Sequence, residues 1–182
     1  MRQQMINAAA QSTVIVQNPC PSAQYSVAIT PLVVKPMVFD GEGHPTSGML
    51  RFPVKEEGCG VTRLLNALIW VQGPGTAGTA AIAPGTTIAD PILQKDTSAR
   101  AFGAAVLAAP PDAACNVKYL ADTEFVSREK AVEGSAIPPA WRENWTIVLC
   151  TKKVVVPVFF TPDSTGTGIR AGGPEMKVYT AP

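Results

Sequence analysis

The segment from Trp141 to Phe160 constrains the fold of this chain more than any other. It reads Trp-Arg-Glu-Asn-Trp-Thr-Ile-Val-Leu-Cys, then a short polar break, then Val-Val-Val-Pro-Val-Phe-Phe. Two apolar runs rich in Val, Ile, Phe and Trp on either side of a polar break are typical of a buried β-hairpin. The segment therefore predicts the centre of a sheet core, with Trp145 near its entry and Cys150 at its corner.

The two tryptophans of this hairpin, Trp141 and Trp145, have two interpretations. Exposed indoles next to Arg142 and Glu143 would form a ledge for a binding partner. The sequence favours the other interpretation, in which both indoles fill the end of the core while Arg142 and Glu143 face water.

Other short segments show the alternation of a half-buried strand or the β-branched content of a buried one. They are Thr13–Gln17, Gln24–Thr30, Met49–Val54, Val61–Gln72, Asn116–Glu129 and Met176–Tyr179. Leu32–Lys35 lies between Pro31 and Pro36, and because proline cannot donate to a sheet ladder, this piece is expected at an edge.

One helix is predicted. Asp90 is a suitable N-cap, Pro91 suits the first helical position, and Pro110 with Pro111 ends the segment. Its expected apolar stripe, at helical spacing, is Ile92, Ala99, Phe102 and Val106.

These elements predict an α+β fold: a mostly antiparallel, sandwich-like β domain with one packed amphipathic helix and long Pro/Gly-rich loops. A chain of 182 residues suits a single domain. The predicted boundaries are an N-terminal segment over 1–12, a β-rich domain over 13–161 with the helix at about 91–107, and a Gly/Thr/Pro-rich tail over 162–182.

The four cysteines are Cys20, Cys59, Cys115 and Cys150. No Cys-x-x-Cys pair is present, so zinc chelation and thiol exchange are not indicated. An even count at wide spacing fits two disulfides, and locality favours Cys20–Cys59 with Cys115–Cys150. Four buried free thiols remain the alternative. Disulfides would imply an oxidising compartment.

The first ten residues lack the apolar run of a signal peptide, so the chain is either cytosolic or exported with a signal that this sequence does not show. The motif Trp-x-Glu-x-Trp-Thr-x-x-x-Cys at 141–150, followed by Val-Pro-Val-x-Phe-x-Pro-Asp-x-x-Gly-Thr, is similar to the C-terminal part of exported bacterial proteins of unassigned function. This resemblance implies the bacterial envelope, and the expected location is periplasmic, outer-membrane-associated or extracellular.

Composition excludes several partners. The formal charge is +1 and no run of like charges occurs, which argues against nucleic acid. No apolar stretch is long enough for a membrane-spanning helix. With 46% apolar and 16% charged residues, the chain is expected to be globular.

Two motifs have a functional and a structural interpretation. Gly73 to Gly78 matches Gly-x-Gly-x-x-Gly, but Pro84 and Gly85 would end any helix needed to hold a dinucleotide, so a flexible loop is favoured. Asp40, Glu42 and His44 have metal-ligand side chains, yet Asp-Gly is a strong turn signal and favours a hairpin.

The sequence assigns no catalytic, cofactor-binding or metal-binding residue, no cofactor and no small-molecule substrate. Carboxylate pairs such as Glu143 with Asp163 carry no mark of catalysis. We expect a non-catalytic structural or accessory subunit of a bacterial envelope-associated assembly, for example a secretion-type complex, that acts through other protein subunits. The alternatives are an exported hydrolase-like or metal-binding enzyme with carboxylates near Asp40 to His44, and a virion surface protein.

Overall fold

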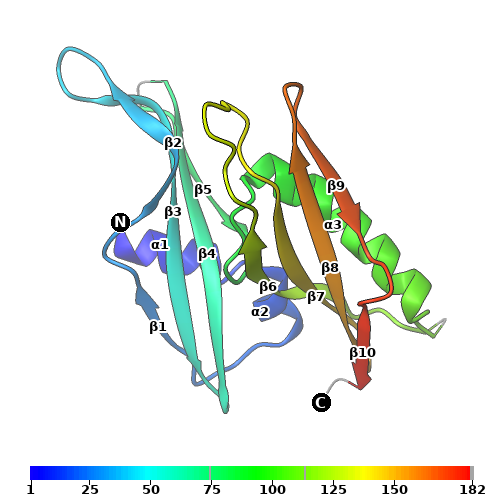
Figure 1. Cartoon of the computed structure of the whole chain (residues 1–182). Coiled ribbons are helices and arrows are strands. Elements are labelled where there is room, and N and C mark those ends of the chain that lie inside the picture. The colour runs from blue at the N-terminus through cyan, green and yellow to red at the C-terminus, as the bar shows by residue number, and fades with distance from the viewer. Residues whose placement is uncertain (74, 113, 181–182) are drawn as a thin grey trace. The chain divides into compact units, whose positions relative to one another are not determined.

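The computed structural model describes residues 1–73, 75–112 and 114–180, and it divides into two compact units, Met1–Gly85 and Thr86–Pro182. Figure 1 shows one antiparallel sheet in each unit. The mostly antiparallel α+β fold predicted from the sequence is confirmed, with 47% of the described residues in strands and 17% in helices. The division at Gly85 falls inside the predicted domain of residues 13–161.

The first unit has two helices and a five-stranded sheet. Its elements are α1 (Arg2–Ala9), α2 (Thr13–Gln17), β1 (Gln24–Val27), β2 (Leu32–Phe39), β3 (Pro45–Gly58), β4 (Val61–Gln72) and β5 (Ala77–Ile82). The strand order is β1-β3-β4-β5, and β2 pairs with β3 beyond the end of β1. Helix α1 packs on β4 and β5 and buries Met5, Ala8 and Ala9.

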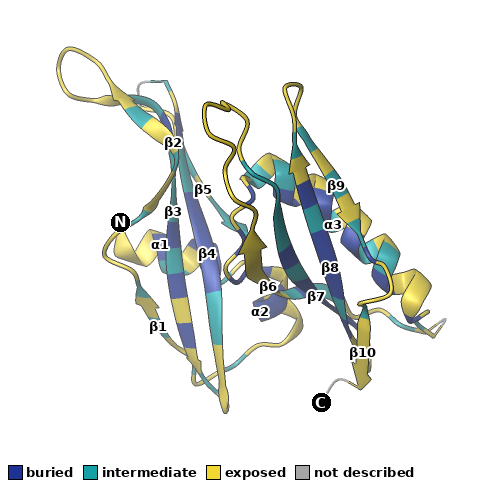
Figure 2. Cartoon of the chain, viewed as in Figure 1, coloured by how far each residue is buried: buried dark blue, intermediate teal, exposed yellow. Residues whose placement is uncertain are grey.

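The second unit has one long helix and a second five-stranded sheet. Its elements are α3 (Pro91–Ala108), β6 (Lys118–Arg128), β7 (Trp141–Leu149), β8 (Lys152–Pro162), β9 (Thr167–Ala171) and β10 (Lys177–Thr180). The order is β10-β8-β7-β6, with β9 also paired to β8. Helix α3 packs on β7, β8 and β9. The fully buried residues of β7 and β8 form the core of this unit, and Figure 2 shows buried positions along both strands.

The two units repeat one layout. In each, a helix precedes a cysteine, the cysteine precedes an edge strand, and the two long central strands are joined by a two-residue turn that begins with a second cysteine. These turn cysteines, Cys59 and Cys150, have left-handed backbones with φ of 48° and 53°. They are bonded to Cys20 and Cys115, and both pairs have a Cα–Cα distance of 5.8 Å. The structure thus contains both disulfides that sequence locality favours.

Residues 13–17 form helix α2, so the strand predicted there is wrong. The β-branched run favours a strand by propensity. Val14 and Ile15 are both buried although they are neighbours in sequence. Consecutive residues of a strand point to opposite faces, whereas on a helix they are only about 100° apart and can both lie within one buried side, so tertiary burial outweighs local propensity here.

Helix α3 lies where the sequence places it, and the Asp90 carboxylate caps it by accepting bonds from the N–H groups of Ile92 and Leu93 at 2.8 and 3.0 Å. The predicted apolar stripe is wrong, because Ile92 is 78% exposed and Val106 is also exposed. The buried face consists of Gln94, Thr97, Ala101 and Ala105.

The polar side chains of this face can be buried because they form hydrogen bonds with nearby backbone carbonyls. Gln94 Nε2 donates to the carbonyl of Ala89 at 2.8 Å, and Thr97 Oγ1 donates to the carbonyl of Leu93 at 2.7 Å. Small residues let the helix approach the sheet closely: a Cβ added at Gly172 would lie 3.2 Å from Ala104 Cβ. A search for large apolar side chains at helical spacing therefore selects the wrong face.

Two stretches predicted as loop or tail contain strands. The Gly-x-Gly-x-x-Gly run forms the turn between β4 and β5: Thr76 N donates to the Gly73 carbonyl, and Gly78 already lies in β5. Pro74, within this run, is outside the described residues. The predicted tail over 162–182 contains β9 and β10, which extend the sheet along β8.

Candidate functional site

A pocket in the second unit lies over a row of side chains that crosses four strands. Ser127 on β6 is opposite Arg142 on β7, Arg142 is opposite Phe159 on β8, and Phe159 is opposite Arg170 on β9. Directly opposed residues of antiparallel strands project to the same face of a sheet. The register therefore brings two arginines, one aromatic ring and one hydroxyl together.

Two guanidinium groups contact the ring of Phe159. The Cζ atom of Arg170 is 3.9 Å from the ring centroid and that of Arg142 is 5.3 Å away, both within cation–π range. Arg142 Nη2 also pairs with Glu175 Oε2 at 2.6 Å. Arg142 Nε is buried and has no hydrogen-bond partner in the part of the chain that the structure describes.

The pocket has a volume of about 320 Å³. Small-molecule sites usually measure roughly 300–1,000 Å³, so this one has the size of a small ligand or of one side chain. Its lining residues are Ser127, Glu129, Ala140, Trp141, Arg142, Phe159, Phe160, Thr161 and Arg170.

The opposite face of β7 holds a buried carboxylate. Glu143 is fully buried, and three neutral donors bind it: Trp141 Nε1 at 3.0 Å and Ile88 N at 2.9 Å to Oε1, and Trp145 Nε1 at 2.9 Å to Oε2. The expectation that Glu143 faces water is wrong. The reason is the strand period of two, which places Glu143 on the same side as both indoles.

The two tryptophans differ in exposure. Trp145 is fully buried in the core. Trp141 is half-buried and stacks on Phe160, with ring centroids 4.5 Å apart and an interplanar angle of 9°. Both indole N–H groups are used by Glu143, so they anchor the hairpin internally.

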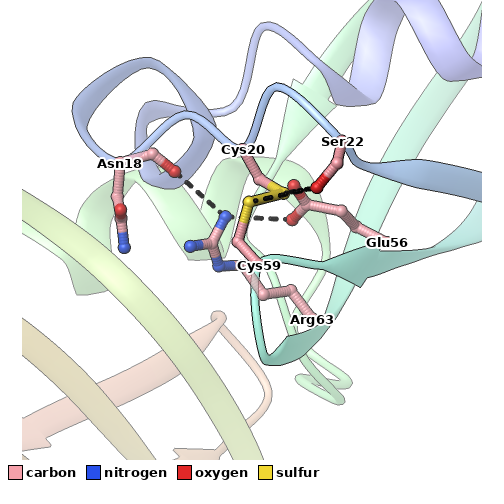
Figure 3. Close-up of a disulfide and its surroundings, with 6 residues drawn as sticks. All are labelled: Asn18, Cys20, Ser22, Glu56, Cys59 and Arg63. Carbon is pink, nitrogen blue, oxygen red and sulfur yellow. Dashed lines mark hydrogen bonds and ion pairs between the residues drawn. A yellow bond between two sulfur atoms is a disulfide. The ribbon is translucent and has the colours of Figure 1, made fainter.

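The disulfide of the first unit adjoins a second buried carboxylate (Figure 3). Arg63 Nη1 donates to Glu56 Oε2 at 3.0 Å and to the carbonyl of Asn18 at 3.1 Å, and Glu56 is fully buried. Ser22 Oγ lies 3.6 Å from the sulfur of Cys20 and 3.5 Å from that of Cys59. These contacts tie the loop before β1 to the turn between β3 and β4.

Tyr25 belongs to this cluster because it is opposite Glu56, which is opposite Arg63. Burial raises the pKa of the Tyr25 phenol, and the charge of Glu56 and its hydrogen bond with the phenol raise it further, while Arg63 acts in the opposite direction. The arrangement is that of a structural polar row across three strands.

The turn that contains Asp40, Glu42 and His44 joins β2 to β3. Asp40 Oδ1 accepts bonds from Glu42 N at 2.9 Å and His44 N at 2.8 Å, and His44 Nδ1 lies 3.6 Å from one carboxylate oxygen of each acid. Within the described residues, no group of three His, Cys, Asp or Glu side chains is arranged to hold a metal ion. The side chain of Asp40 serves the turn itself.

The carboxylate pair of Glu143 and Asp163 is engaged in structural contacts. Asp163, in the turn between β8 and β9, accepts bonds from the Thr165 hydroxyl and from the N–H groups of Thr165 and Gly166. The hydrogen bond from the Thr165 side chain, followed by those from the two amides, lowers the pKa of Asp163. Both oxygens of Glu143 are bound by the donors described above.

The arginine pocket was not identified from the sequence, although the sequence contains the information for one of its residue pairs. Counting outward from the two-residue turn at Cys150 and Thr151 places Arg142 opposite Phe159, as observed. The contributions of Ser127 and Arg170 depend on the bulge in β6 and on the pairing of β9, which no local pattern reveals.

The chain matches no protein-family model, no curated protein and no solved structure. In the residues that the structure describes, no helix has the length and apolar content needed to cross a membrane.

Proposed function

We propose that this protein is a non-catalytic structural or accessory subunit of a bacterial envelope-associated assembly, for example a secretion-type complex, and that it acts through protein–protein contacts. The single observation that carries the proposal is the apolar surface of β2 and of the turn before it. The exposed apolar residues there are Ile29, Leu32, Val33, Val38 and Phe39. Ile29 is 98% exposed, Val33 65% and Phe39 57%.

The far end of the β2–β3 hairpin extends beyond the rest of its sheet. Pairing of β3 with β4 begins at Ser47, so the pairs Val38 with Ser47 and Phe39 with Pro45 lie at or past the end of β4 (Figure 1). Exposed apolar side chains that are concentrated in one place mark interaction sites on soluble proteins. We name residues 29–47 the apolar arm.

The kind of contact follows from the composition of the arm. Lys35 and Pro36 lie within β2, and a charge and a missing N–H both oppose the addition of another strand along an edge. We therefore expect the arm to pack its side chains into an apolar groove of a partner subunit, without a continuous ladder of backbone hydrogen bonds.

Two disulfides support an oxidising compartment, as found outside the cytosol. The proposed location is the periplasm, the outer-membrane surface or the extracellular space. A subunit of an envelope assembly would meet its partners there.

The test compares two single exposed apolar residues, each replaced by serine. Phe39→Ser changes the arm, and Ile92→Ser changes a 78% exposed residue of the second unit and serves as the matched control. We expect the wild type and Ile92→Ser to sediment from the source envelope in a particle larger than the 19.1 kDa chain, and Phe39→Ser to sediment as the free chain. Both variants should melt like the wild type.

A wild-type chain that is extracted as a lone monomer, or that turns over a substrate by itself, would contradict the proposal. If both variants stay in the particle equally, the apolar arm is not the contact, although the protein is still part of an assembly.

A further inference from the structure

We propose that the pocket formed by Arg142, Phe159 and Arg170 binds a carboxylate. This site is separate from the apolar arm, and the inference goes beyond the assembly function and does not rest on it. The ligand is a monocarboxylate with a small apolar body, either a free acid or the side chain of an acidic residue in another protein.

Arg142, which lines the pocket, has one buried donor that no other described group uses. Arg142 Nε is buried without a hydrogen-bond partner among the described residues. Buried polar groups in proteins are almost always paired, and a single orphan donor requires an explanation. The Nε and Nη2 groups of a guanidinium form a fork that matches the two oxygens of a carboxylate.

A second guanidinium group, that of Arg170, lies in the same cross-strand row. Arg170 is exposed, so its donors are open to an incoming group, and its position 3.9 Å from the Phe159 ring centroid holds it over the ring. A carboxylate in the pocket that reaches both guanidinium groups would receive a charge-assisted hydrogen bond from each.

The size and the polarity of the pocket also suit a small carboxylate. A liquid water occupies about 30 Å³, so a pocket of about 320 Å³ has room for a carboxylate with a short chain. The Phe159 ring and Ala140 offer apolar surface for that chain, and Ser127 and Thr161 offer hydroxyls. Glu129 on the lining disfavours a second negative charge, which is why we specify a monocarboxylate.

Glu175 is the internal competitor for this site. Its carboxylate pairs with Arg142 Nη2 through one oxygen and its side chain is 55% exposed, so an incoming carboxylate can displace it at small cost. Neutralising Glu175 should therefore strengthen binding, an effect that a purely structural ion pair would not produce.

The experiment titrates the whole protein with sodium hexanoate and with its neutral analogue hexanamide, and follows backbone amide shifts by NMR. A parallel pair of capped peptides, Gly-Gly-Glu-Gly-Gly and Gly-Gly-Gln-Gly-Gly, separates a free acid from a protein side chain as the source of the carboxylate. We expect carboxylate-dependent shifts at residues 127, 142, 159 and 170, with no matching shifts for the amide or for the Gln peptide.

The variants are Arg170→Gln, Glu175→Gln and, as a charge-matched control, Arg2→Gln at an exposed site of the first unit. Arg170→Gln removes one charge-assisted bond and should raise the Kd for the carboxylate probe about tenfold. Glu175→Gln should lower the Kd by a factor of about two to five. Arg2→Gln should leave it unchanged. Because Arg170 and Glu175 are exposed, their replacement should not prevent folding, which thermal melting checks.

Three results would overturn the inference. They are the absence of shifts with either carboxylate probe, equal shifts with the neutral analogues, and a Kd that Arg170→Gln changes no more than Arg2→Gln. Binding of hexanoate alone identifies a free acid as the ligand, and binding of the Glu peptide identifies a partner protein.

Discussion

At the scale of single residues, Glu143 is a fully buried carboxylate whose oxygens are bound by neutral donors. A carboxylate without solvent is costly unless its oxygens are bound, and here two indoles and one backbone amide bind them. The Trp-x-Glu-x-Trp spacing supplies two of these donors from the same strand face, and the amide of Ile88 arrives from the segment before α3.

We predict that Glu143→Gln destabilises the protein by about 1–3 kcal/mol, because one amide oxygen cannot accept all three bonds and the amide NH₂ would face donors. Urea unfolding of the purified protein measures the change. The matched control is Glu124→Gln, an exposed acid on the neighbouring strand, which we expect to change stability by less than about 0.5 kcal/mol. Equal stability of the two variants would show that the indole bonds to Glu143 contribute little.

At the scale of elements, the β7–β8 hairpin is the centre of the second unit. Fully buried side chains alternate along both strands, with Trp145 and Ile147 on β7 opposite Val156 and Val154 on β8. Helix α3 covers the same strands. The hairpin is therefore a packing element, and the arginine row is on its other face.

Trp145→Ala should accordingly cost about 3–5 kcal/mol of stability, because a fully buried aromatic side chain is removed and a cavity remains. Thermal or denaturant unfolding gives the value, and Trp141→Ala, which truncates a half-buried indole, should cost less. A Trp145→Ala variant that keeps its melting temperature and loses a binding partner would instead assign this side chain to an interface.

On the scale of the whole molecule, the chain repeats one arrangement of helix, edge strand, long hairpin and disulfide. Each disulfide joins the loop before the edge strand to the turn of the central hairpin, at sequence separations of 39 and 35 residues. The repeat predicts that each bond stabilises the unit that contains it.

Replacing either cysteine pair by serine, Cys20 with Cys59 or Cys115 with Cys150, should cost about 3–4 kcal/mol by the loop-entropy estimate. Hydrogen exchange should show lost protection in β3 and β4 for the first pair, and in β7 and β8 for the second. Mass spectrometry under non-reducing conditions on protein from its source provides the prior check, since four free thiols there would contradict an exported location.

Local patterns predicted much of the fold. The hairpin over Trp141 to Phe160, the helix after the cap at Asp90 and the edge position of Leu32–Lys35 all follow from short-range chemistry. The predictions fail where a residue's partner lies far along the chain. Thr13–Gln17 forms a helix because its neighbouring apolar residues are buried together, and packing against β7, β8 and β9, which are distant in sequence, decides which face of α3 is buried.

The hairpin at Trp141 to Phe160 likewise has features that local sequence patterns determine and features that depend on long-range contacts. Its strands, its turn and the pairing of Arg142 with Phe159 could be read from the chain, because strand period and turn length are local properties. The strand period also places Glu143 on the side of both indoles, whereas only the tertiary structure brought the amide of Ile88 to its carboxylate and Arg170 over Phe159. Both contacts join residues whose proximity depends on long-range packing, and no spacing in the sequence encodes it directly.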